Sequence, residues 1–294
     1  MERLYKYTNA ESGINYYLCR QQLCFTSVRH LNDPVEAIPD CTHLLELSRE
    51  HRTQNLGSEL REQGFVDAPD DSFDKLRKHL ESTGELQTSD AYEAVVCWRY
   101  FGNILRNIGV LSLSACPRIP LMWSHYADMS GLTLGFSTKS EIISGRNALK
   151  LDGPQQVNYQ ESRHPYTSPG IDVAALALQK GKFWEYENEY RCFREIQGDD
   201  ERVVLEFQRE DLEDIIMGCA MSLSNALHVQ KLREEKYPHA SLQIAYPSPK
   251  EYEVDLCPAP TDIDLFKGFF TDETRAYADE VLERHRAQPS DFAQ

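Results

Sequence analysis

Short apolar segments with the alternation of β-strands recur along the chain, separated by segments with helical spacing. The strand-like segments are RLYKYT (3–8), QLCFTSV (22–28), GVLSLSA (109–115), GLTLGFS (131–137), VNYQ (157–160), YENEYRCF (186–193), RVVLEF (202–207), LEDIIMG (212–218) and SLQIAYP (241–247). The helix-like segments are 11–21, 120–130, 172–184 and 222–235, followed by an amphipathic C-terminal stretch. This interleaving predicts an α+β fold with a central mixed β-sheet and flanking helices, in one domain over residues 1–294.

A charged region interrupts this pattern between residues 41 and 108. It contains separable amphipathic pieces such as HLLELSRE, FDKLRKHLES and DAYEAVVCWRYFGNIL, and it holds no internal repeat. We interpret residues 41–108 as a helical insertion within the domain, more suited to a lid or a partner surface than to a reaction centre.

Composition narrows the classes of partner. The formal net charge of −16 repels a nucleic-acid backbone and disfavours a nucleic-acid partner, although a local basic patch could override it. The eight cysteines form no C-x-x-C pair, which argues against zinc and for reduced thiols. No apolar run approaches the roughly 20 residues needed to span a bilayer, and MERLYKYTNAESG lacks the apolar core of a signal peptide. We therefore expect a cytoplasmic protein without a membrane partner or a bound metal.

The segment LMWSHYADMSGLTLGF (121–136) places three ring side chains just before an apolar strand. On a helix, Met122 and Tyr126 share a face with Trp123 beside them, and most such stripes are core. The alternative is that Trp123 or Tyr126 stacks on an aromatic ring of a bound ligand. His125 lies on the flank, where it is either a structural residue or a hydrogen-bond donor to a ligand.

The segment FTSVRHLNDPVE (25–36) ends a strand in a turn, because Pro34 disfavours a helical Asp33. Asn32 or Asp33 either caps the following helix or holds a ribose or amide group. In the second case, Ser27 and Arg29 would approach a pyrophosphate.

The segment YENEYR (186–191) carries paired carboxylates. As a strand it would place Glu187, Glu189 and Arg191 on one face, where the two carboxylates resist simultaneous ionisation and Arg191 holds one of them charged. As a helix, Glu187 and Arg191 would form an ordinary surface i,i+4 pair.

Two resemblances add to this interpretation. The motifs NDPxE, MWxHYAxxxGxxLGF and WxYExEYR, together with the opening LYKYT, resemble a widespread, mostly bacterial domain of unknown function. The strand–helix–strand start and the late Glu-x-Glu are also similar to ADP-ribosyltransferases, including compact toxin-like forms. The first strand departs from that pattern, since LYKYT offers Lys6 where the family has histidine or arginine.

The second resemblance implies an NAD-consuming transferase that acts as a toxin or antiviral effector. Its substrate would be NAD, and its partner would be a protein acceptor or an antitoxin. Glu189 would be the catalytic carboxylate that stabilises an oxocarbenium-like ribose, with Glu187 and His125 as further catalytic candidates. The implied binding residues are Lys6, Tyr7, Ser27, Arg29, Asn32, Asp33, Trp123 and Tyr126.

Two other hypotheses remain open. One is a module that senses a nucleotide or metabolite without turnover and reports through the helical insertion. The other is a metal-dependent hydrolase or nuclease that uses Asp33, Glu36, Glu187 and His125. The sequence contains no P-loop, G-x-G-x-x-G, H-E-x-x-H or G-x-S-x-G motif to decide between them.

Overall fold

The computed structural model describes residues 2–33, 35–40, 98, 101–102, 105–145, 153–163, 173–198 and 200–270. The expected helical insertion at 41–108 lies almost entirely outside these residues, and so does the chain after Phe270, which includes most of the expected C-terminal helix.

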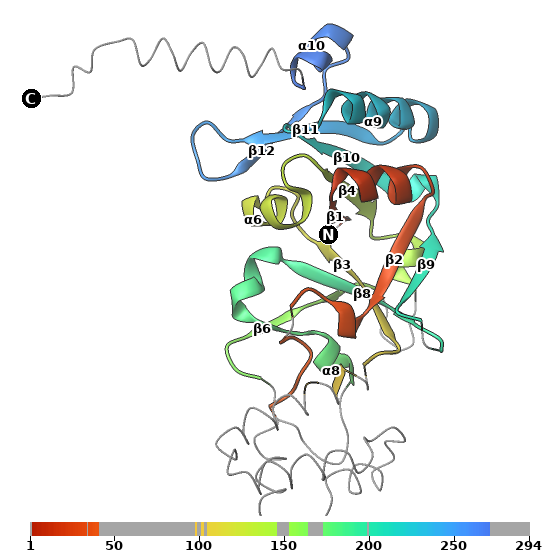
Figure 1. Cartoon of the computed structure of the whole chain (residues 1–294), viewed down its shortest axis with the longest axis vertical. Helices are drawn as coiled ribbons and strands as arrows, with labels where there is room; N and C mark the ends of the chain where they lie inside the picture. Colours follow the sequence, from red (N-terminus) through yellow and green to blue (C-terminus); the bar gives the residue numbers. More distant parts are fainter. Residues whose placement is uncertain are drawn as a thin grey trace, which may run out of the picture.

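Ten strands form one mixed sheet (Figure 1). They are β1 (Arg3–Thr8), β2 (Gln22–Ser27), β3 (Ile108–Ser114), β4 (Leu132–Ser137), β5 (Gln155–Gln156), β8 (Glu189–Glu195), β9 (Arg202–Glu206), β10 (Leu212–Gly218), β11 (Ser241–Pro247) and β12 (Val254–Pro258). The main path runs β12-β11-β10-β4-β1-β3-β2-β9, and β8 pairs with β3 and β5. Only β10 and β11 pair in parallel within this sheet, across the crossover helix α9 (Leu223–Lys236), so the α+β prediction is confirmed.

The sheet divides at β3. One edge of β3 pairs with β8 along its whole length. The other edge pairs with β2 near its start, through Gly109 and Val110, and with β1 at its end, through Ser114. Among the described strands, none pairs with residues 111–113 on this second edge, and β1 and β2 diverge there.

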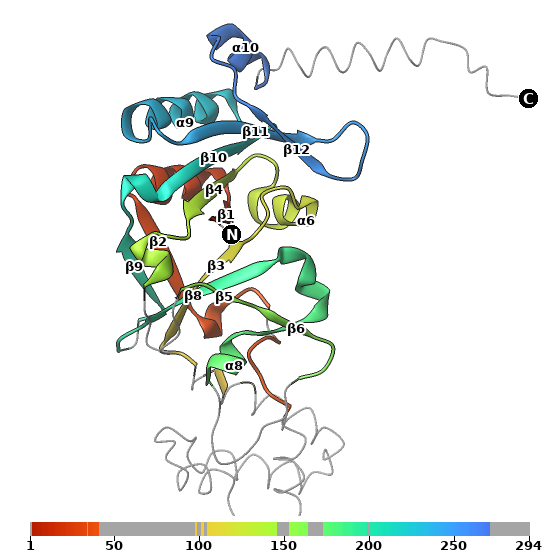
Figure 2. The same cartoon turned by 180° about the vertical axis from the view of Figure 1, so that it is seen from behind.

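Apolar residues cover both faces of the sheet. Successive residues of a strand point to opposite faces, so Ile215 and Met217 of β10 join one core while Ile216 joins another. The larger core is covered by α9 and by the short α1 (Ala10–Ser12) and π-helical η1 (Gly13–Leu18), and the smaller one by α6 (Pro120–Met122) and π-helical η4 (Trp123–Ala127). Figures 1 and 2 show α9 beside β11 at one end of the described part of the chain and β8 toward its other end.

Side-chain chemistry fixes where these helices begin. Asn9 accepts a hydrogen bond from the backbone N–H of Ser12 before η1, and Ser222 accepts one from Asn225 at the start of α9. Both are ordinary N-cap interactions, which satisfy N–H groups that have no partner within the helix.

One expected helix is wrong over most of its length. Residues 172–184 were expected to be helical, but only α8 (Val173–Ala177) is, and it is followed by β7 (Gln179–Gly181) and the 3-10 helix η5 (Lys182–Glu187). β7 pairs in parallel with β6 (Asn158–Gln160) in a separate two-stranded sheet. The physical reason is tertiary, because Lys180 on β7 is buried by ion pairs with residues of η5 and β8.

The expected strand at 186–193 begins later, at Glu189, so Glu187 does not share a strand face with Glu189. Between them Asn188 has φ 46°, a left-handed conformation in which Asn is enriched. The sequence-based element list also lacked β12, which has only five residues and contains a proline.

Candidate functional site

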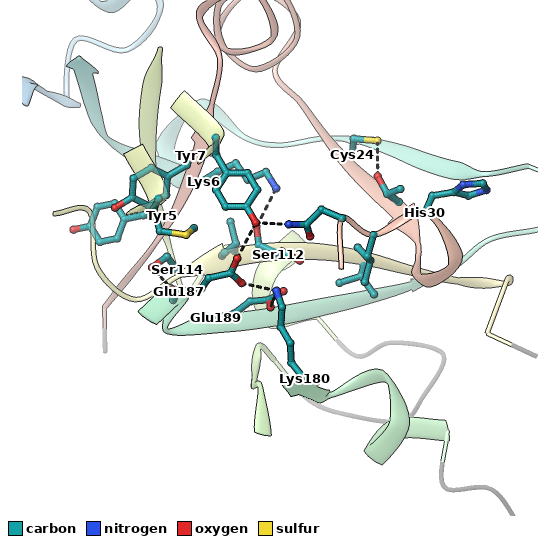
Figure 3. A pocket seen from close by; sticks show the side chains of 17 residues that line it. Tyr5, Lys6, Tyr7, Cys24, His30, Ser112, Ser114, Lys180, Glu187 and Glu189 are labelled. Atoms are coloured by element: carbon teal, nitrogen blue, oxygen red, sulfur yellow. Dashed lines mark hydrogen bonds and ion pairs between the residues drawn. The ribbon is translucent and has the colours of Figure 1, made fainter. Parts of the chain in front are cut away.

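A cavity of about 180 Å³ lies where β1 and β2 separate along β3. Because no described strand pairs with residues 111–113 on this edge, side chains rather than backbone fill the gap, and the Lys6 amine donates to the Ser112 carbonyl at 3.1 Å. Figure 3 shows the labelled side chains converging on this cavity from several strands. It is lined by Tyr5, Lys6, Tyr7, Cys24, Thr26, His30, Leu31, Asn32, Val110, Ser112, Leu113, Ser114, Met122, Tyr126, Lys180, Glu187 and Glu189.

A buried ammonium joins the two carboxylates of the cavity wall. Lys180 Nζ lies 2.5 Å from Glu187 Oε2 and 3.1 Å from Glu189 Oε2. All three side chains are at most 4% exposed, so water screens these contacts little. The left-handed Asn188 reverses the chain between the two glutamates, which lets both reach one lysine.

Arg191 extends this network into the interior. Its Nε lies 2.8 Å from Glu189 Oε1, its Nη2 contacts both Glu189 and Glu36, and its Nη1 donates to the Ala177 carbonyl at 2.7 Å. The Arg191 and Glu36 side chains are each 1% exposed. This is the arrangement in which a planar guanidinium is most effective, with several fixed donors satisfied at once.

The pKa values of two buried glutamates in the network, Glu36 and Glu189, shift in opposite directions. Burial alone would raise the pKa of Glu189, but the charges of Arg191 and Lys180 and hydrogen bonds from Arg191 and Ser112 lower it to about 2. Burial raises the pKa of Glu36, and Arg191 and Lys180 offset this only in part. Burial would lower the pKa of Lys180, but its neighbouring carboxylates, Glu189 first, outweigh that effect and raise it. Glu189 is therefore ionised at neutral pH.

A tyrosine holds the other oxygen of Glu187. The Tyr126 hydroxyl donates to Glu187 Oε1 at 2.7 Å and accepts a hydrogen bond from the Asn32 amide. Burial and the Glu187 charge raise the pKa of Tyr126, so it stays protonated and keeps donating. This contact ties the NDP turn to the Glu-x-Glu segment.

An aromatic cluster adjoins the network, formed by His125, Trp184 and Tyr186. The three ring centroids are separated by 6.0 to 6.5 Å, and Tyr186 Oη lies 3.1 Å from His125 Nδ1. Lys180 Nζ lies 5.0 Å from the Trp184 ring centroid, in a cation–π contact. The cluster is partly exposed and is connected to the cavity through Lys180.

Two buried carboxylate oxygens have no hydrogen-bond partner in the described structure, Oε1 of Glu36 and Oδ2 of Asp33. The other oxygen of Asp33 accepts a hydrogen bond from the Val35 N–H at 2.9 Å, a turn contact of the kind that Asp makes with its own backbone.

The structure brings together six of the residues expected from sequence. Lys6, Tyr7, Asn32, Tyr126, Glu187 and Glu189 all line the cavity. The other five do not line it. Ser27 is buried and donates to the Arg106 carbonyl at 2.7 Å, while Arg29 is exposed. Asp33 forms its turn contact, and His125 is exposed at the aromatic cluster.

Trp123, the last of the five, is fully buried. Its ring packs edge-on against Tyr7 at 5.6 Å, and its indole N–H donates to the Pro117 carbonyl at 2.9 Å. The ring therefore belongs to the core of the smaller apolar cluster, and the neighbouring rings of Trp184 and Tyr186 are the ones with exposed surface.

Sequence reasoning missed Lys180, Tyr5, Ser112 and His30 among the lining residues. Lys180 gave no usable signal, because the segment LQKGKFW is compatible with an amphipathic helix. Ser112 and Tyr5 lie on strands that were predicted, and the alternation of those strands identifies the faces but not the gap between β1 and β2.

The arrangement of the acidic and basic side chains bears on the class of site. Within the described ranges, no group of three or more His, Cys, Asp or Glu residues is arranged to hold a metal ion. The carboxylates that do converge have Lys180 and Arg191 between them, which supplies the positive charge that a metal would otherwise bring. None of the helices in the described part of the chain is both long and apolar enough to traverse a bilayer.

These features define an α+β domain with a buried ionic network beside a small polar cavity. Residues 122–192 match a family model described as "Protein of unknown function (DUF2971)". The matched stretch contains Tyr126, Lys180, Glu187, Glu189 and Arg191, and it confirms the resemblance to a domain of unknown function over this part of the chain. No curated protein and no solved structure, of the ADP-ribosyltransferase type or any other, matches the chain.

Proposed function

We propose that the cavity binds the nicotinamide–ribose end of NAD and that the chain cleaves the bond between them, as an ADP-ribosyltransferase or NAD glycohydrolase. The observation that carries the proposal is the pair of carboxylates, Glu187 and Glu189, bridged by Lys180 at the cavity wall.

The charge balance suits this chemistry. Cleavage of the C–N bond sends the electron pair to nicotinamide and leaves positive charge on the ribose C1, and a fixed negative charge nearby stabilises that transition state. The network carries three carboxylates, Glu36, Glu187 and Glu189, against the two cations Lys180 and Arg191, so one negative charge remains when all are ionised. The low pKa of Glu189, about 2, keeps it in the charged form that the step needs.

The remaining lining groups suit a ribosyl ligand. The second N–H of the Asn32 amide and the remaining N–H groups of Lys6 are donors for ribose hydroxyls, and unused lone pairs on the carboxylates accept from those hydroxyls. A cavity of about 180 Å³ is smaller than the roughly 300–1,000 Å³ of sites that enclose a drug-sized ligand, so it takes one end of the dinucleotide. The exposed surface of Trp184 and Tyr186 is available to stack on a base outside the cavity.

After cleavage, water or an acceptor side chain adds to the ribose C1, and its proton passes to a base such as Glu187. With a protein acceptor, the chain would act as a toxin or antiviral effector in the cytoplasm. With water alone, it would deplete NAD.

The test uses NAD labelled in the nicotinamide ring and the full chain. Wild type should release nicotinamide, and Glu189→Gln and Glu187→Gln should each lower the rate by two orders of magnitude or more, on the order of the loss when one electrostatic contact to the transition state is removed. Glu185→Gln is the matched control, because Glu185 is exposed on the same segment. A silent wild type, or an undiminished Glu189→Gln protein, would contradict the proposal.

One observation favours a second candidate, a binding module without turnover. Every oxygen of Glu189 already contacts Arg191 or Lys180, which is the geometry of a rigid ground-state network. This candidate expects NAD or ADP-ribose to raise the melting temperature with no release of nicotinamide.

A further inference from the structure

Two lysines line the same cavity in contrasting surroundings. Lys180 is ion-paired with Glu187 and Glu189, whereas the Lys6 amine donates to an uncharged acceptor, the Ser112 carbonyl, at 3.1 Å. Among the described residues, no carboxylate lies within ion-pair distance of Lys6. Lys6 is therefore held at the cavity wall without a partner that fixes its charge.

The surroundings of Lys6 favour the uncharged form of its amine. Burial lowers the pKa of Lys6, and electrostatic interactions with more distant groups, Glu189 first, offset this only in part. The pKa of Lys180 moves in the opposite direction, because its carboxylate contacts are direct. An uncharged amine is the nucleophilic form of lysine, and desolvation is a recognised way to produce it.

The origin of this setting is the strand arrangement. Tyr5 and Tyr7 flank Lys6 on β1, and the Tyr7 ring is held in the core by Trp123 and by its own hydrogen bond to the Cys116 carbonyl at 2.8 Å. The Lys6 side chain extends into the gap between β1 and β2, where its amine reaches the Ser112 carbonyl. Lys6 is partly buried there and lines the cavity, which places its side chain beside the space that a small molecule would occupy.

We propose that Lys6 is a nucleophile that forms an imine with a small hydroxylated aldehyde or ketone bound in the cavity. The amine lone pair attacks the carbonyl carbon and forms a C–N bond, while the carbonyl oxygen takes up the proton that the nitrogen loses. In the resulting carbinolamine the nitrogen lone pair then forms the C=N bond as the C–O bond breaks, and the departing hydroxyl takes up the remaining N–H proton and leaves as water.

The other lining groups determine the class of carbonyl compound. Glu187 and Glu189 accept hydrogen bonds from ligand hydroxyls, and Asn32 and Tyr126 present an amide and a phenol. A volume of about 180 Å³ suits a molecule of a few carbons. This chemistry describes an open-chain hydroxyaldehyde of the glyceraldehyde type. The inference does not depend on NAD cleavage.

The experiment incubates the full chain with glyceraldehyde and cyanoborohydride, which adds hydride to the imine carbon and fixes the adduct as a secondary amine. Peptide mapping by mass spectrometry then compares Lys6 with Lys180 and with the exposed Lys182 and Lys139. Lys6 should be labelled fastest at neutral pH, because the fraction of free amine rises roughly tenfold for each unit by which a pKa is lowered. Lys180 should be the slowest.

Two controls make the result decisive. The selectivity for Lys6 should vanish in urea, where all lysines become equivalent, and Lys6→Met should lose the cavity adduct while retaining adducts on Lys182. Labelling of Lys6 no faster than that of Lys182 in the folded protein, or with a pH midpoint at or above that of Lys182, would overturn the inference. The readout is a mass adduct, whereas the NAD proposal reads nicotinamide release, so either can fail without the other.

Discussion

Glu189 and Arg191 lie two residues apart on β8, and their side chains pair twice in the interior, Nε to Oε1 at 2.8 Å and Nη2 to Oε2 at 3.1 Å. Because alternate residues of a strand share a face, the two side chains can pair while β8 keeps its regular strand conformation. Arg191 thereby links the cavity wall to Glu36, which is 155 positions away in sequence.

Arg191→Met should destabilise the fold by about 3–5 kcal/mol, since removing one partner of a buried ion pair leaves uncompensated charge. Here it would leave Glu36 and Glu189 facing each other with only Lys180 to balance them. Urea unfolding of the variant measures the loss. Arg202→Met, at an exposed position, serves as control, and equal stability of the two variants would contradict the structural role of Arg191.

The stability of the protein should fall in acid because of Glu189. Its folded-state pKa of about 2 lies below the ordinary value of 4.5, so its contribution is fully present above about pH 4.5 and is lost as the pH falls toward 2. Glu189→Gln should show a shallower decline of the unfolding free energy over this range. Identical slopes for variant and wild type would disprove the assignment.

Glu36 should give the opposite sign in the same measurement. Its pKa is raised in the folded state, so the stability linked to its proton is fully present below its unfolded pKa and is lost as the pH rises through the folded value. Glu36→Gln should remove that decline on the alkaline side of pH 4.5, and chemical denaturation at several pH values would reveal it. A Glu36→Gln curve that matches the Glu189→Gln curve would contradict the separation of the two groups.

Tyr126→Phe should weaken the site by removing the donor to Glu187 and the acceptor for Asn32. Leaving a buried acceptor unsatisfied costs about 1–3 kcal/mol, more when it is charged. The unfolding free energy and the affinity for NAD should both decrease. Tyr16→Phe, at a tyrosine that is 48% exposed, should change neither, and an unaltered Tyr126→Phe protein would remove Tyr126 from the network.

Trp184→Ala should reduce the affinity for NAD without reducing the affinity for ribose 5-phosphate, which has no ring to stack. Stacking of a base on an aromatic side chain is worth about 1–3 kcal/mol. Phe183→Ala removes the adjacent ring, which is 94% exposed, and is the matched control. A loss of affinity that is equal for both ligands would show that Trp184 acts through its contact with Lys180 instead.

The sequence predicted the parts of the fold that depend on local pattern. Strands such as β1 and β4 alternate clearly, and α9 begins at a serine cap, so their limits were close to those observed. Lys180 could not be placed, because its burial depends on carboxylates that reach it only after the chain turns at Asn188. Asn32 and Tyr126 were each candidates, but their contact joins segments 94 positions apart and no local signal reports it.

The gap in strand pairing beside β3 affects which amino-acid substitutions the cavity can accept. The hollow arises from the divergence of β1 and β2, which is backbone geometry, and not from small side chains that larger ones would fill. Substitutions at the lining positions would therefore alter the chemistry of the chamber while leaving its framework standing, so one scaffold could be adapted to many small ligands.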